Sequence, residues 1–402
     1  MRKLLLILLA LFLLIGCSQA EKPDPKPDPK PAPEPQPEPN PDSKTETDPA
    51  KELLDTLTLE EKVGQLFVVR LEVLCEDKTQ AEKNAYRRNG AKELDESMIA
   101  VLNRYHIGGF VLFGKNLLNP EQLINLNRQI RKNCKIVPFI TIDEEGGQVG
   151  RIAWNENFEV TTFPLLYDYF ADGDTARAFL VGNTIGTYLR EYGFNAVFAP
   201  VADVFTNPDN TVIGKRAFGS DPHFVSDMIS ACLDGFHEEG IMTTLKHYPG
   251  HGDTSSDTHN DTVNTSKTWD QMEECELIPF VENLDNTEMI MAVHITVNGD
   301  SDPASLSYNA LTERLRNKYG YKGLIISDAL DMGAISSHYT SEEAAVKAFL
   351  AGCDLLLMPA NFIRAYSAII DAVNSGTISM ERLDESVLRI LRYKLSNSLS
   401  GE

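Results

Sequence analysis

Short, continuous apolar runs alternate along the chain with longer amphipathic stretches. A continuous apolar run is typical of a parallel strand that is covered on both faces, and an amphipathic stretch is typical of a helix. Eight strand–helix units in about 350 residues favour a single-domain α/β fold, a (β/α)8 barrel of the TIM type, with a doubly wound open sheet as the alternative. The predicted strands are Leu66–Val69, Gly109–Phe113, Val137–Ile142, Ala196–Pro200, Met242–Lys246, Met289–His294, Leu324–Ser327 and Leu355–Met358.

The amphipathic stretches predict helices between these strands. Thr58 and Glu61 have the spacing of a capping box, which predicts that a helix begins near residue 58. The segment Leu71–Met98 is strongly charged where a short first loop would suffice, and we interpret it as a helical insertion. Other predicted helices span Ala176–Tyr192, Phe224–Glu239, Trp269–Glu282 and Glu342–Ala351.

The first 47 residues have a different character. A short basic start precedes the apolar run 4–15, which has the length of a signal-peptide core rather than of a membrane span. The run ends at Gly16-Cys17, which resembles a bacterial lipobox, where cleavage precedes a cysteine that then carries lipid. A plain secretory signal or an uncleaved anchor is the alternative. Residues 22–42 have proline at nearly every second position and predict an extended spacer.

These features predict three parts of the chain. Residues 1–16 form a signal peptide, residues 17–47 hold the lipidated Cys17 and the proline-rich linker, and residues 48–402 form one folded domain. The domain is thus expected outside the cytoplasm of a bacterium, held on a membrane through Cys17.

Charge and cysteine usage narrow the choice of partners. The net charge of −22 argues against a nucleic-acid partner, because phosphate binding needs a basic face. The cysteines include no C-x-x-C pair, so neither a disulfide framework nor a zinc site is expected. The five cysteines after Cys17 are interpreted as buried free thiols.

Polar residues recur where the predicted strands end. Catalytic groups of a barrel lie at the carboxyl ends of its strands, so this pattern predicts a pocket for a polar ligand. The residues, in strand order from the third to the seventh, are Asp143 with Glu144 and Glu145, then Asp203, Lys246 with His247, His294 and Asp328.

Four blocks of sequence carry a family resemblance. They are IDEEGG at 142–147 with Arg151, GKRAFG at 214–219, KHYPGHGDT at 246–254 followed by D-T-H at 257–259, and SDALDM at 327–332. In this order they resemble the β-N-acetylglucosaminidase (β-N-acetylhexosaminidase) branch of glycoside hydrolase family 3, over about residues 50–395. The resemblance implies a catalytic barrel that hydrolyses terminal, non-reducing N-acetylglucosamine with retention, without a cofactor or a metal.

The resemblance also implies roles for individual residues. Asp328 matches the nucleophile, His259 the acid/base, and Asp257 the carboxylate that orients the imidazole. The positions that match substrate-binding residues are Asp143, Arg151, Arg216, Lys246 and His247.

Other interpretations of these residues stay open. Asp328 has the position of a helix N-cap, and the charged residues could form structural ion pairs. A metal site at His247, His251, Asp257 and His259 is disfavoured, because the intervening proline and glycine break any helix that would align the histidines.

The activity also has alternatives. Cell-wall fragments or environmental glycans are the expected substrates. A phosphorylase or β-glucosidase of the same family, or a glycan-binding lipoprotein without turnover, is also considered. Gln148 departs from the family, since many relatives carry arginine there.

Overall fold

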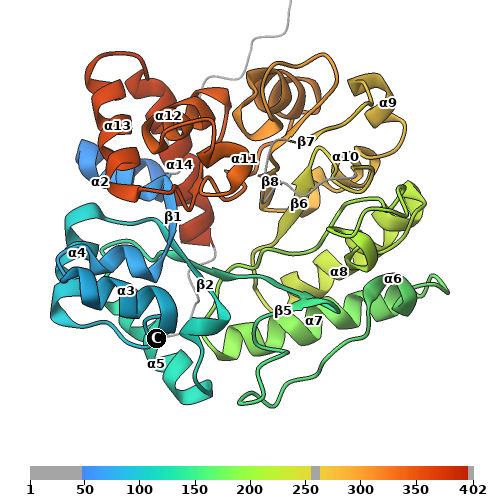
Figure 1. The fold of residues 1–402 in the computed structure, drawn as a ribbon, viewed down its shortest axis with the longest axis horizontal. Helices are drawn as coiled ribbons and strands as arrows, with labels where there is room; N and C mark the ends of the chain where they lie inside the picture. Colours follow the sequence, from blue (N-terminus) through green and yellow to red (C-terminus); the bar gives the residue numbers. More distant parts are fainter. Residues whose placement is uncertain (1–47, 255–262, 397–402) are drawn as a thin grey trace, which may run out of the picture. The chain divides into compact units, whose positions relative to one another are not determined.

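Parallel strands lie in the interior with helices around them (Figure 1). The structure, a computed structural model, describes residues 48–254 and 263–396. One sheet has the strand order β11-β1-β2-β3 and another has the order β10-β8-β6, and neighbouring strands in both are parallel. These strands are β1 Phe67–Arg70, β2 Gly109–Leu112, β3 Phe139–Ile142, β6 Thr244–Tyr248, β8 Met289–Ala292, β10 Leu324–Ser327 and β11 Leu356–Leu357.

Backbone hydrogen bonds link the two sheets at both edges. Residues 195–201 run between β3 and β6, and they bond to Ile142 on one side and pair with Lys246 on the other. At the opposite edge, Ile326 of β10 forms a bridge with Leu355, which directly precedes β11. The α/β class predicted from the sequence is confirmed.

Two predicted elements differ from the structure. Residues Ala196–Pro200 do not form a strand: Ala196 alone forms an isolated bridge, with Met242, and Pro200 has no N–H group to donate to a ladder. The single helix predicted at Trp269–Glu282 is two short helices, α9 Trp269–Glu273 and α10 Ile278–Glu282. Pro279 lies in the first turn of α10, where its missing N–H is tolerated, so the chain begins a new helix there.

The remaining elements follow the prediction closely. The capping box is present: the Thr58 hydroxyl accepts the N–H of Glu61, whose carboxylate accepts the N–H of Thr58. The insertion after β1 is helical, with η1 Leu71–Cys75 and α3 Gln80–Asn89. The other helices are α1 Pro49–Asp55, α2 Leu59–Gln65, α4 Glu96–Tyr105, α5 Pro120–Lys132, α6 Leu166–Tyr169, α7 Thr175–Glu191, α8 Pro222–Glu238, α11 Gly333–Ser336, α12 Ser341–Ala351, α13 Phe362–Asn374 and α14 Met380–Ser396.

Short elements complete the fold. The 3-10 helices are η2 Gly114–Asn116, η3 Gly214–Arg216, η4 Leu284–Asn286 and η5 Ala304–Leu306, and η6 Asn309–Lys318 is a π-helix. The short strands are β4 Glu144–Gly146, β5 Val149–Gly150, β7 Val263–Asn264 and β9 Ile295–Thr296. The hairpin of β4 and β5 lies directly after β3, where the sequence predicts the polar pocket.

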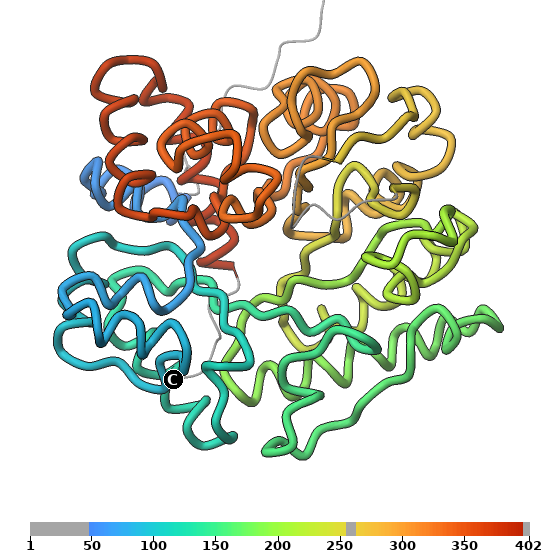
Figure 2. Tube along the Cα trace, in the orientation of Figure 1, coloured from blue at the N-terminus to red at the C-terminus, as the bar shows by residue number. Residues whose placement is uncertain are grey.

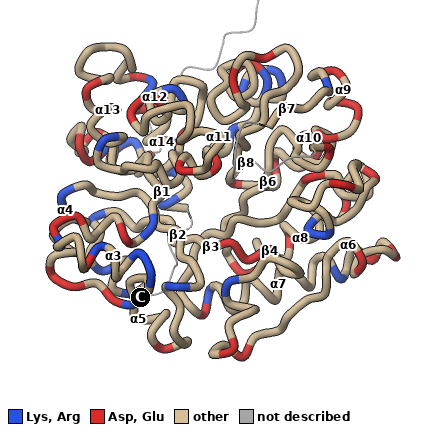
Figure 3. The backbone as a smooth tube through the Cα atoms, viewed as in Figure 1, with Lys and Arg blue, Asp and Glu red and all other residues tan. Residues whose placement is uncertain are grey.

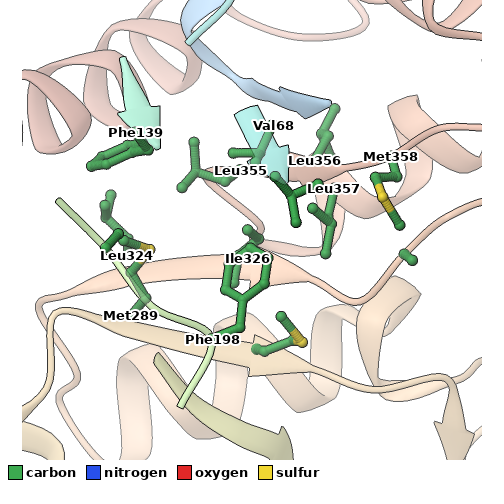
Figure 4. Close-up of a cluster of buried hydrophobic side chains, with 14 of the residues drawn as sticks. Val68, Phe139, Phe198, Met289, Leu324, Ile326, Leu355, Leu356, Leu357 and Met358 are labelled. Carbon is green, nitrogen blue, oxygen red and sulfur yellow. The ribbon is translucent and has the colours of Figure 1, made fainter. Parts of the chain in front are cut away.

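Apolar side chains from both sheets fill the space between them (Figure 4). Val68 and Phe139 come from the first sheet, Met289 and Ile326 come from the second, and Phe198 comes from the linking segment. All five are almost fully buried. Because this core is packed with side chains, the space between the two sheets leaves no room for a ligand.

The two ends of the described domain lie side by side (Figure 2). Arg392 of α14 donates to the Asp48 carboxylate at 2.7 Å, just before α1. In the described part of the chain, no helix has the length and apolarity needed to cross a membrane. The cysteine prediction is confirmed for the buried, free Cys75, Cys232 and Cys353, but Cys134 and Cys275 are partly exposed. 

Candidate functional site

A cavity of about 500 Å³ lies at the carboxyl ends of the strands. β3, β6 and β10 each deliver polar side chains to it, and the β5 turn and η3 supply an arginine each. The structure therefore brings together the predicted residues Asp143, Arg151, Arg216, Lys246, His247 and Asp328.

Glu144 holds the hairpin that presents Arg151. Its buried carboxylate accepts the backbone N–H groups of residues 151–153 at 2.6 to 2.9 Å, and the hydroxyl of Tyr188 at 2.9 Å. Burial raises the pKa of Glu144, although these hydrogen bonds oppose the increase. β4, which carries Glu144, is drawn as an acidic stretch near the middle of the molecule (Figure 3).

Two glycines allow this hairpin to turn. Gly146 and Gly147 have φ angles of 81° and 59°, in the left-handed region that favours glycine. A Cβ at Gly147 would also lie 2.9 Å from the carbonyl oxygen of Pro164. The glycines after the acidic run thus allow the hairpin to bring Arg151 to the cavity that Asp143 and Glu145 line.

Glu145 is the centre of the ion-pair network. Its carboxylate accepts hydrogen bonds from Arg216 Nε at 2.9 Å and Nη2 at 2.8 Å, and Lys246 Nζ lies 2.6 Å away. Burial favours the neutral acid, but the charges of Arg216 and Lys246 outweigh it and hold the pKa of Glu145 well below its ordinary value. Our prediction of binding residues missed Glu145, although it lies in the same block as Asp143.

Asp143 joins this network from the end of β3. It accepts a hydrogen bond from Lys246 Nζ at 3.0 Å, and Arg151 Nη2 lies 3.4 Å from its other oxygen. Burial would raise the pKa of Asp143, but the Lys246 charge outweighs this effect and the pKa is lowered. Arg151 Nε is buried without a hydrogen-bond partner in the described residues, so a donor is left for a ligand.

Asp203 contacts His247 in β6 and the backbone of His251 just after β6. Its Oδ2 lies 2.6 Å from Nδ1 of His247, and its Oδ1 accepts the backbone N–H of His251 at 2.6 Å. Burial raises the pKa of Asp203, but the interaction with His247 outweighs it and the net direction is downward. Asp203 was only a weak candidate from the sequence, since a single acid after a strand has many possible roles.

Asp328 lines the cavity, and its carboxylate accepts few hydrogen bonds from the described residues. Its Oδ1 accepts the N–H of Ala329 at 2.7 Å, and no ion pair to Asp328 occurs within the described residues. It is not an N-cap, because the next helix, α11, begins only at Gly333. The His294 ring forms hydrogen bonds with the Ser305 hydroxyl and the Ala329 carbonyl, so it stabilises the turn that carries Asp328.

Three predicted residues cannot be placed. Asp257, His259 and Cys17 lie outside the described residues. Within residues 48–254 and 263–396, no group of three or more His, Cys, Asp or Glu side chains is arranged to hold a metal ion.

The cavity presents charged hydrogen-bond donors and acceptors suited to a polar ligand, and comparison with known proteins identifies the family of the chain. The model of the glycosyl hydrolase family 3 N-terminal domain matches residues 58–393. The chain therefore belongs to glycoside hydrolase family 3, as the sequence motifs predict.

Individual relatives agree with this assignment. The chain is 30% identical to β-hexosaminidase A of Pseudoalteromonas piscicida over 84% of this chain and 61% of that protein. It is 34% identical to the β-hexosaminidase of Tolumonas auensis, over 71% of this chain and 85% of the relative. Among solved structures, it resembles a family 3 β-N-acetylglucosaminidase from Paenibacillus sp. str. FPU-7 with a TM-score of 0.77 and 32% identity, over 86% of this chain and 64% of that one.

Proposed function

We propose that this chain is an exo-acting β-N-acetylhexosaminidase that removes terminal N-acetylglucosamine from cell-wall fragments or other glycans. The observation that carries the proposal is the carboxylate of Asp328, which has no ion pair within the described residues and faces an otherwise ion-paired, donor-rich cavity. The names of the relatives, β-hexosaminidase and β-N-acetylglucosaminidase, support the sugar specificity.

The proposed reaction is a double displacement with retention. An oxygen of Asp328 attacks the anomeric carbon and forms a glycosyl ester, while the bond to the leaving oxygen breaks and that oxygen takes a proton from the His259 imidazolium. The neutral imidazole then removes a proton from water, which attacks the same carbon and releases Asp328. Asp257 accepts the other ring N–H of His259 and fixes its tautomer.

The terminal sugar is held by the network around Glu145. Asp143 accepts hydrogen bonds from sugar hydroxyls, and Arg151, Arg216, Lys246 and His247 donate to them. These donors are already oriented by their carboxylate partners, so they need little rearrangement when the sugar binds.

The proposal extends to architecture and location. The two linked sheets and the segment between them are taken together as one (β/α)8 barrel, supported by the bridges at both edges. Residues 1–16 are proposed as a signal peptide, and Cys17 as the site of a lipid anchor that holds the enzyme outside the cytoplasm.

Hydrolysis of an aryl β-N-acetylglucosaminide by the purified chain tests the function. We expect Asp328→Asn to lower kcat by at least about 10³-fold, because a carboxamide cannot form the glycosyl ester. The control is Asp384→Asn, which removes an acid that pairs with Lys62 on a helix remote from the cavity. Equal turnover by the wild type and Asp328→Asn would exclude this nucleophile, and an inactive wild type would exclude the function.

A further inference from the structure

The residue proposed as acid/base lies between two described ends of the chain. Residues 255–262, which include His259, connect Thr254 to Val263. Thr254 belongs to the turn that follows β6, and Val263 begins β7. The groups that hold these two ends therefore bear on where His259 can act.

The first end is packed against the chain that follows Asp203. A Cβ on Gly252 would lie 1.9 Å from the carbonyl oxygen of Val204, so the two backbones approach as closely as only glycine allows. Asn207 Nδ2 donates to the carbonyl oxygens of Asp253 and of the next residue, at 3.3 Å in each case. The backbone of this end is thus held, and the carboxylate of Asp253 is left to contact other groups.

The second end is held along β9. β7 pairs in parallel with β9, the strand that begins directly after His294. Beyond β7, the Thr265 N–H donates to the Thr296 carbonyl at 3.1 Å. The Asn298 N–H then donates to the Lys267 carbonyl at 3.2 Å, so the backbone is held as far as Lys267.

The ammonium of Lys267 links the two ends through two carboxylates. Its Nζ lies 3.5 Å from Asp253 Oδ1, and it forms a close ion pair with Glu276, which lies between α9 and α10. A Cβ on Gly250 would lie 2.6 Å from the Glu276 Cβ, so Glu276 packs directly against the turn that follows β6. Burial would lower the pKa of Lys267, but the hydrogen bond with Glu276 outweighs it and the pKa is raised.

Glu276 makes this link difficult to displace. Its side chain is fully buried, and Lys267 is its one cationic partner in the part of the chain that the structure describes. Its Oε2 has no hydrogen-bond partner among the same residues. Moving Lys267 away would leave a buried carboxylate without a compensating charge, which is strongly unfavourable.

We propose that Lys267 is a positioning residue for the acid/base. By joining Asp253 to Glu276, it fixes both ends of the segment that carries His259, and so sets the reach of the imidazole to the leaving oxygen. This inference rests on the proposed function, in which His259 donates the proton. General acid catalysis contributes about 10²–10⁴-fold and requires hydrogen-bond distance, so a displacement of either end should lose part of that factor.

Two substrates with different leaving groups test the inference. Dinitrophenolate leaves without a proton, whereas the leaving sugar of N,N′-diacetylchitobiose needs one, and kcat/KM reports the step that forms the glycosyl ester. We expect Lys267→Met to lower kcat/KM about tenfold for the disaccharide and less than about twofold for the dinitrophenyl β-N-acetylglucosaminide. A loss of folded protein would lower both values equally and leave their ratio unchanged.

Three further variants serve as controls. Lys62→Met removes a cation that pairs with Asp384 on α14, does not line the cavity, and should leave the ratio of the two kcat/KM values unchanged. Lys267→Arg keeps the charge and should restore most of the activity on the disaccharide. Asp253→Asn leaves the pair of Lys267 with Glu276 intact and should give a smaller loss, again confined to the disaccharide.

Azide gives a second readout. It attacks the anomeric carbon of the glycosyl ester without a general base, forms a glycosyl azide and releases the Asp328 carboxylate. Azide should therefore raise the kcat of Lys267→Met on the dinitrophenyl substrate more than it raises that of the wild type. An equal effect of azide, or equal losses of Lys267→Met on the two substrates, would overturn the inference alone. A wild type that cleaves neither substrate contradicts the proposed function, and the inference with it.

Discussion

Replacing Glu145 by glutamine tests whether the ion-pair network holds the candidate site together. Glutamine keeps the shape and one acceptor oxygen, but it removes the negative charge shared by Arg216 and Lys246. Both cations are largely buried, with side chains 13% and 3% exposed, so water cannot replace the lost partner. Glu145→Gln therefore isolates the contribution of one charge.

The size of the effect follows from these contacts. Breaking a buried ion pair by removing one partner costs about 3–5 kcal/mol, because an uncompensated charge stays buried. Lys246 keeps Asp143 as a partner, so we expect the lower end, about 3 kcal/mol. With a urea m-value of about 3 kcal/mol/M, the unfolding midpoint should fall by about 1 M.

Urea unfolding followed by circular dichroism measures this change. The matched control is Glu282→Gln, which removes an exposed acid paired with His223 and should change stability by less than about 0.5 kcal/mol. Because the pKa of Glu145 is lowered in the folded state, its stabilisation is present above the unfolded pKa near 4.5 and is lost as the pH falls toward the folded value. The difference between the wild type and Glu145→Gln should thus persist at pH 7 and narrow below pH 4.5.

Two results would refute this reasoning. Stability of Glu145→Gln within about 0.5 kcal/mol of the wild type at pH 7 would show that the network does not depend on this charge. A difference that grows as the pH falls below 4.5 would contradict the direction of the pKa shift.

Three further predictions concern other buried groups. Burial lowers the pKa of Lys394 to about 7, so between pH 7 and 10.5 the unfolded chain binds more protons than the folded chain. From pH 7 to 9 the free energy of unfolding of the wild type relative to Lys394→Met should therefore rise by about 1.4 kcal/mol per pH unit. A difference between the two proteins that does not change with pH would contradict this. Asp203→Asn should raise KM about tenfold with a smaller effect on kcat, because His247 loses the carboxylate that orients it, and an unchanged KM would exclude that role. Glu144→Gln should lower the free energy of unfolding by about 2 kcal/mol in urea titrations, because the carboxamide N–H₂ cannot accept the hairpin's N–H groups, and a smaller loss than that of an exposed control would contradict it.

Strand positions could be predicted because buried parallel strands have a simple pattern. Met289–Ala292 is apolar at every position, and Leu324–Ser327 is apolar up to its last residue. Both strands are buried on both faces, one against helices and the other against the interior between the two sheets (Figure 4). A proline accounts for each of the two elements that were predicted wrongly. Pro200 interrupts a ladder and Pro279 begins a new helix, and periodicity alone does not report the missing donor.

The candidate site could be located from the sequence, but its internal division of roles could not. Asp143, Glu144 and Glu145 are consecutive acids, and nothing in their spacing separates them. The backbone of the hairpin sends Glu144 into its own turn and Glu145 to Arg216 and Lys246. The cavity between the helical insertion after β1 and residues 358–363 could not be predicted from the sequence either, because these segments meet only through the tertiary fold.

The ion pairs of the site leave hydrogen-bond donors unused, and these donors account for the kind of ligand that it selects. The Lys246 ammonium has three N–H groups, of which Asp143 and Glu145 take two. Arg151 Nε has no partner in the described residues, and Arg216 uses only part of its five N–H groups. Because nearby carboxylates already balance most of these charges, an anion would gain little here, whereas a neutral hydroxyl can accept from the spare donors and donate to Asp143. The electrostatics thus favour an uncharged sugar beside Asp328.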